Sequence, residues 1–139
     1  MTLRLTGLIV VALALLAPSA TSGAPTQRAQ HPRTALLYQV TLFKQAKWRA
    51  MYATYTPRFR GSCAYAKFVS QQRRLRGALG TNFQVTGIQT RLETARRAIV
   101  AYRFVKDGRT IAAVTFRNRD VYKLIGTRWF DELDRVSTC

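Results

Sequence analysis

Carboxylates are the side chains of this 139-residue chain best suited to transfer a proton, and one of them has a distinctive position. Asp131 alternates with Trp129 and Leu133 along a segment of strand-like periodicity, so we expect it on an inward face. Burial in an apolar site raises the pKa of a carboxyl group and allows it to act as a general base. The alternative is an acid at the rim of a sheet, paired with an arginine. The remaining acids fit turns and strand ends or carry no such signal: Glu93, Asp107, Asp120, Glu132 and Asp134.

The sequence offers few residues for other kinds of catalytic chemistry. The single histidine, His31, lies in a stretch with prolines and no apolar periodicity, so a catalytic triad or a histidine-based metal site cannot be assembled in the folded part. Paired carboxylates and helix-borne metal ligands are also absent from the sequence pattern. We therefore expect no cofactor and no metal, and the balance favours a binding protein over an enzyme.

The N-terminal segment predicts export. Residues 1–22 combine one arginine, an apolar run and small residues at two suitable cleavage positions, as in a secretory signal peptide. The run is shorter than the roughly 18–20 apolar residues of a spanning helix, so we expect no membrane span after cleavage. Residues 23–33 are expected to form a flexible mature N-terminus, and residues 34–139 a single domain in a secreted, extracytoplasmic protein.

The two cysteines are expected to pair. Cys63 and Cys139 both follow the export signal, and an even count in an oxidising compartment favours a disulfide over two free thiols. Such a bond would join the start of the second predicted helix to the last residue of the sequence.

The charge balance points to anionic partners. The formal net charge is +17, which predicts attraction to polyanions. The basic residues are spread along the chain, however, and a solvated arginine-rich surface accounts for them equally well. Weak polyanion binding is therefore one of the functions that the composition allows.

Apolar periodicity predicts two helices. The first spans residues 33–55, with Trp48, Met51, Tyr52 and Tyr55 on one stripe, and it stops before Pro57. The second spans about residues 62–78, with Ser62 as its N-cap. In both, the rings lie on the buried stripe and most basic residues lie off it.

Alternation with a period of two then predicts four strands, at residues 83–93, 96–105, 109–123 and 129–136. A three-residue loop, Lys106 to Gly108, is expected to pair Val105 with Arg109, because that register keeps one face apolar. Two helices packed on a curved antiparallel sheet of about four strands make an α+β domain.

The motifs WRAMY (48–52), PRFR (57–60), YAKFV (65–69) and GTRW (126–129) resemble the nuclear transport factor two-like superfamily, whose fold is a cystatin-like α+β cone. This resemblance covers about residues 34–136. It implies an interior that serves isomerase-like and dehydratase-like enzymes and many non-enzymatic binding modules.

An aromatic pocket is the expected site within that cone. Its candidate lining residues are Trp48, Tyr52, Tyr55, Tyr65, Phe68, Tyr102 and Trp129. The leading hypothesis is a secreted, non-catalytic module that binds an unidentified small molecule or protein, with a homodimer through the sheet as one arrangement. The alternatives are an isomerase- or dehydratase-type enzyme with Asp131 as base, and a secreted polyanion-binding protein.

Overall fold

The structure is a computed structural model, and it describes residues 31–111, 119–132 and 139. Helices come first and strands follow, as expected for an α+β domain. The helices are α1 (Pro32–Lys44), α2 (Trp48–Tyr52), α3 (Pro57–Ser62) and α4 (Tyr65–Leu79). The strands are β1 (Gln84–Thr94), β2 (Arg97–Lys106), β3 (Arg109–Thr110), β4 (Arg119–Ile125) and β5 (Arg128–Asp131).

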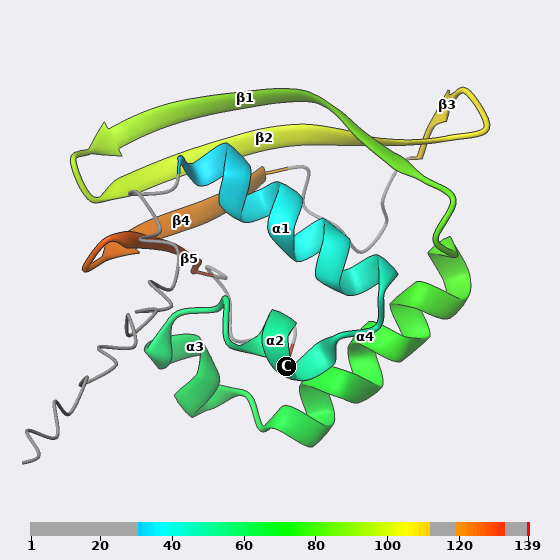
Figure 1. The fold of residues 1–139 in the computed structure, drawn as a ribbon, viewed down its shortest axis with the longest axis horizontal. Coiled ribbons are helices and arrows are strands. Elements are labelled where there is room, and N and C mark those ends of the chain that lie inside the picture. Colours follow the sequence, from blue (N-terminus) through cyan, green and yellow to red (C-terminus); the bar gives the residue numbers. More distant parts are fainter. Residues whose placement is uncertain (1–30, 112–118, 133–138) are drawn as a thin grey trace, which may run out of the picture.

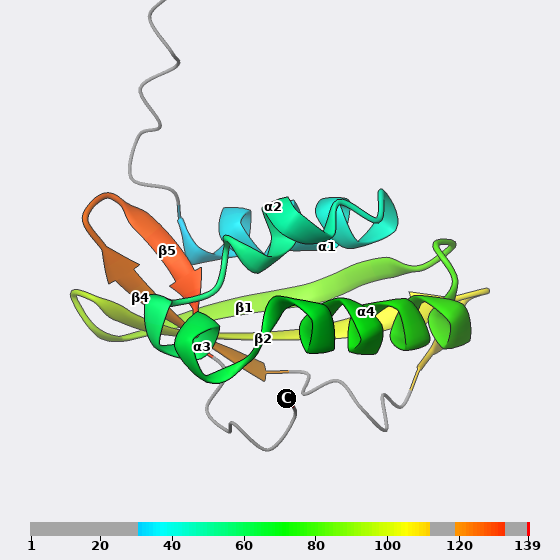
Figure 2. The same ribbon diagram turned by 90° about the horizontal axis from the view of Figure 1, so that it is seen from below.

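The strands form one antiparallel sheet in the order β1-β2-β4-β5, with the short β3 also paired to β2. Figures 1 and 2 show the helices gathered on one side of this twisted sheet, with α1 lying along β1 and β2. The α+β prediction is therefore confirmed. Among the described residues, no helix is long and apolar enough to cross a membrane.

The first predicted helix is wrong as a continuous element, because it is interrupted between α1 and α2. Ala46 adopts a left-handed backbone, with φ of 55°. The N–H of Ala46 bonds to the carbonyl of Phe43 at 3.1 Å, and the N–H of Lys47 bonds to that of Leu42 at 2.9 Å. This pair of bonds is a Schellman motif, which satisfies the last carbonyls of α1. The turn then places the Trp48 ring against Phe43, with centroids 5.8 Å apart.

The second predicted helix corresponds to α4, and a short helix that was not predicted, α3, precedes it. Thr56 and Pro57 were expected only to end the first helix, but they also begin α3. The Thr56 hydroxyl caps α3 by accepting a hydrogen bond from the Phe59 N–H at 3.3 Å. Proline at the first helical position suits this start. Ser62, predicted as an N-cap, is the last residue of α3. Helix α4 ends at Leu79 and is capped by Gly80, whose φ of 73° is a conformation that glycine adopts freely.

The hairpin register differs from the prediction as well. Lys106 pairs with Arg109, and Val105 pairs with Thr110, across a two-residue turn. Asp107 and Gly108 both have positive φ, 52° and 75°, as a type I′ turn requires. Aspartate tolerates this conformation and glycine adopts it freely, so the local Asp-Gly preference sets the register. The further pairing expected for residues 112–116, and the end of the fourth strand beyond residue 132, lie outside the described residues.

The concave face of the sheet carries the buried side chains of the core. Along β2 these are Ala98, Val100, Tyr102 and Phe104, all with at most 5% exposure. The β5 edge is covered by the chain after α2, since the Asp131 N–H bonds to the Thr54 carbonyl and the Thr56 N–H bonds to the Asp131 carbonyl. Covering an edge in this way removes unpaired backbone groups from solvent.

The predicted disulfide is present. Cys63 and Cys139 are paired, with Cα atoms 5.4 Å apart, and Cys63 is buried after the end of α3. The bond therefore joins the α3–α4 connection to residue 139.

Candidate functional site

Asp131 lies inside the fold, as the strand parity predicts. It pairs with Tyr122 between β5 and β4, so both side chains share the concave face of the sheet. Its exposure is 3%. The interpretation of Asp131 as a rim acid paired with an arginine does not describe this position.

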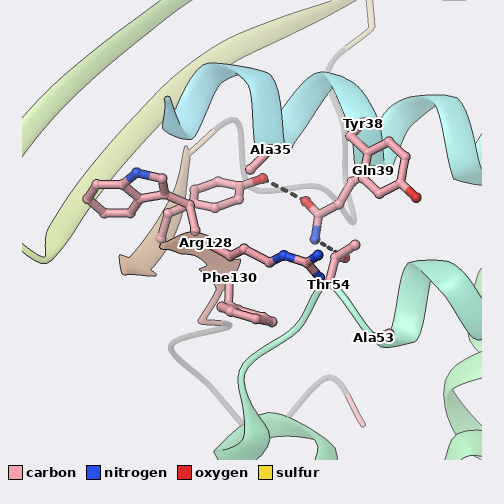
Figure 3. Close-up of a pocket in the computed structure, with 9 residues that line it drawn as sticks. Ala35, Tyr38, Gln39, Ala53, Thr54, Arg128 and Phe130 are labelled. Atoms are coloured by element: carbon pink, nitrogen blue, oxygen red, sulfur yellow. Dashed lines mark hydrogen bonds between the residues drawn. The ribbon is translucent and has the colours of Figure 1, made fainter. Parts of the chain in front are cut away.

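Gln39, from the middle of α1, organises the polar groups around Asp131. Its side-chain N–H groups donate to Asp131 Oδ2 at 3.3 Å and to Thr54 Oγ1 at 2.8 Å. Its carbonyl oxygen accepts from the Tyr122 hydroxyl at 2.6 Å. Figure 3 shows the Gln39 amide pointing to Thr54, with their hydrogen bond as a dashed line. One amide therefore links α1, the segment after α2, and both C-terminal strands.

Burial dominates the electrostatics of this cluster. It raises the pKa of Asp131 well above its ordinary range, Asp120 raises it further, and the hydrogen bond from Gln39 lowers it. Asp131 Oδ1 is buried without a hydrogen-bond partner among the described residues. The protonated form of Asp131 is thereby favoured, because a buried charge without full hydrogen bonding is costly.

Tyrosine hydroxyls surround the two aspartates. The Tyr102 hydroxyl donates to Asp120 Oδ2 at 2.5 Å. Burial, followed by the nearby aspartates, raises the pKa values of Tyr55, Tyr102 and Tyr122. These hydroxyls therefore stay neutral and act as hydrogen-bond donors or acceptors.

A pocket opens beside this cluster, between α1, the residues after α2, and β5 (Figure 3). Its volume is about 100 Å³. Gln39, Thr54 and Tyr122 line it, so the network that holds Asp131 is also part of the pocket wall. The described residues that line it are Ala35, Tyr38, Gln39, Ala53, Thr54, Tyr122, Arg128, Trp129 and Phe130.

Of the seven aromatic residues predicted for a pocket, Trp129 lines this one. The other six belong to the packed interior. Tyr52 contacts the rings of Tyr65 and Phe68 at centroid distances of 5.3 and 5.1 Å, and Tyr55 contacts Phe68 at 5.3 Å. Trp48 packs on Phe43 and Tyr102 packs on Phe104. The Tyr52 hydroxyl is satisfied by the backbone carbonyls of residues 60 and 63 rather than by Asp131.

The sequence analysis missed the polar residues of the pocket, and Gln39 carried the clearest signal. It lies on the same stripe of α1 as the buried residues Ala35, Leu36 and Phe43. A glutamine there must be hydrogen-bonded inside the fold, so it points to a buried polar network. Tyr122 carried a weaker signal, since it is two residues from Asp120 on one strand face.

No group of three or more potential metal ligands occurs among the described residues. Comparison with protein-family models and with curated proteins gives no match. Function is therefore inferred from the geometry of the pocket and its polar wall.

Proposed function

We propose that this protein is a secreted, non-catalytic binding module of the nuclear transport factor two-like type, and that it holds a small molecule in the pocket between α1 and β5. The observation that carries this proposal is the pocket itself, with a polar wall that the fold holds in place. Preorganised polar groups set into an apolar concavity are typical of ligand sites.

Binding is favoured over catalysis by the position of Asp131. A general base must reach the proton that it removes, directly or through one water. Asp131 does not line this pocket. Gln39, which does line it, donates a hydrogen bond to Asp131 Oδ2. In this proposal, the Asp131 carboxyl group holds Gln39, a residue of the pocket wall, in position.

An isomerase- or dehydratase-type enzyme is the second candidate, and one observation favours it. Asp131 Oδ1 has no partner among the described residues, and the pKa of the carboxyl group is raised. A catalytic base in an apolar site is expected to have both a free oxygen and a raised pKa.

One experiment separates the two candidates. A small-molecule library is screened by NMR on purified protein, with the indole signal of Trp129 as the reporter. Ligands are expected to bind wild type and Asp131→Asn alike. Their binding should be lost in Ala53→Leu, because the larger side chain fills the pocket. Ala78→Leu, an equally exposed change on α4, is the matched control.

The enzymatic arm uses the same two proteins. A 3-oxo steroid or similar isomerisable ketone is expected to turn over no faster with wild type than with Asp131→Asn. A turnover that Asp131→Asn abolishes, while its fold survives, would replace the binding proposal with the enzyme.

Polyanion binding is supported by a separate observation. The helical part, residues 32–79, contains seven arginines and three lysines and no acidic residue. Such an uncompensated charge attracts polyanions in a salt-dependent way. Elution from a heparin column at high salt would support this function, and Arg73→Gln with Arg74→Gln on α4 should lower the salt required.

A further inference from the structure

Among the described residues that line the pocket, Arg128 is the only charged one. It lies on the edge strand β5, is exposed, and has no ion-pair partner among the described residues. Figure 3 shows its side chain extending across the pocket, with the guanidinium group near Thr54. An unpaired guanidinium at the pocket is a fork of donors that matches a carboxylate.

The donors of Gln39, Tyr122 and Thr54 in the pocket wall already have partners. Both side-chain N–H groups of Gln39 are engaged, and the Tyr122 hydroxyl donates to the Gln39 carbonyl. The Thr54 hydroxyl donates to the carbonyl of Met51 at 2.6 Å. Among the described lining residues, the Arg128 guanidinium, the Tyr38 hydroxyl and the Trp129 indole N–H are left to donate to a ligand. An occupant that accepts hydrogen bonds is therefore favoured over one that donates them.

The nearest buried carboxyl group does not repel an anion bound in the pocket. Asp131 lies behind Gln39, and its burial favours the neutral form. The pocket wall therefore presents a net positive charge from Arg128.

Size limits the rest of the ligand. The pocket holds about 100 Å³, less than the roughly 150 Å³ of an apolar cavity that accepts benzene. Ala35, Ala53, Trp129 and Phe130 contribute the apolar part of its lining. A short alkyl chain fits this space better than a ring.

We infer that the pocket binds a short-chain carboxylate, with the carboxylate group on the Arg128 guanidinium and the alkyl chain against Trp129 and Phe130. This inference rests on the proposed function and names the ligand class for the same pocket.

The test compares butyrate with butyramide, which has nearly the same shape and no charge. Each is titrated into purified protein, with the Trp129 indole signal as the readout. Wild type is expected to bind butyrate at least about tenfold more tightly, as the loss of one charge-assisted hydrogen-bond pair implies. Arg128→Gln should remove this preference, and Arg128→Lys should retain part of it.

Arg109→Gln is the control, because it removes the same charge from an exposed position on β3, away from the lining residues. Equal binding of butyrate and butyramide by wild type would overturn the inference and leave the binding function standing. Equal weakening by Arg109→Gln and Arg128→Gln would overturn it too, since it would show a general charge effect. If no small molecule of any kind moves the Trp129 signal, the proposed function itself fails.

Discussion

The side-chain amide of Gln39 donates to Asp131 Oδ2 at 3.3 Å, across 92 residues of sequence. This contact joins α1 to the last strand of the sheet. Because Gln39 also binds Thr54 and Tyr122, one side chain serves two buried polar groups, Asp131 and Tyr122, and the half-buried hydroxyl of Thr54.

Gln39→Ala is therefore expected to lower the free energy of unfolding by about 2–4 kcal/mol, because each buried group left unpaired costs roughly 1–3 kcal/mol. Urea denaturation provides the measurement. Gln45→Ala, at an exposed position just after α1, is the control and should change stability by no more than about 0.5 kcal/mol. Similar losses in both variants would contradict the role assigned to Gln39.

Asp131 should make stability depend on pH. Its folded-state pKa is raised well above the ordinary value of 3.8, so the native state binds more protons than the unfolded state. The stability linked to this group is fully present below about pH 4 and is lost as pH rises towards the folded pKa, by up to about 1.4 kcal/mol per pH unit.

Urea titrations from about pH 4 to about pH 8 should thus show wild-type stability falling relative to Asp131→Asn, which does not titrate. Parallel pH profiles for the two proteins would mean that Asp131 is ionised in the native state without penalty.

The break between α1 and α2 gives a pair of glycine substitutions with opposite effects. Ala46 has φ of 55°, a conformation that costs a residue with a Cβ atom roughly 1–2 kcal/mol. After the added entropy of the unfolded chain is subtracted, Ala46→Gly should stabilise the protein by about 0.5–1 kcal/mol. Ala66→Gly, on the exposed face of α4, should destabilise it by about 1 kcal/mol. Thermal unfolding measures both, and a loss of stability in Ala46→Gly would refute the left-handed turn.

Trp48→Ala should be far more damaging than Arg49→Ala. Trp48 is 9% exposed and packs on Phe43, and truncating such a side chain costs about 3–5 kcal/mol. Arg49 is exposed, but its guanidinium lies 4.9 Å from the Tyr65 ring centroid, a contact worth about 0.5–1 kcal/mol. Comparable melting temperatures for the two variants would show that α2 presents a different face to the core.

Reduction of the Cys63–Cys139 bond should lower stability. The bond spans a sequence separation of 76 residues, and closing so long a loop stabilises the fold by about 4 kcal/mol in the chain-entropy model. Intact mass should rise by the mass of two hydrogen atoms on reduction, and the unreduced protein should resist alkylation. Alkylation of both thiols in unreduced native protein is the result that would disprove the bond.

Local pattern was enough to predict the fold class and the inward position of Asp131. Strand alternation places Asp131 on the same face as Trp129, and this holds wherever the strand lies in the sheet. The even cysteine count likewise predicts the Cys63–Cys139 pair without knowledge of the topology. The ends of the helices were harder to predict from the sequence. Ala46 has no intrinsic preference for the left-handed turn that it adopts, and that turn occurs together with the tertiary packing of Trp48 on Phe43.

The pocket was decided by tertiary structure alone. Gln39, Thr54, Tyr122 and Arg128 come from four separate segments, and no sequence spacing shows that they meet. The same holds for the aromatic residues, whose periodicity marks a buried stripe but cannot distinguish a packed core from a cavity wall. Which of these occurs depends on how completely the facing elements fill the space between them, and that is a property of side chains brought together by the whole fold.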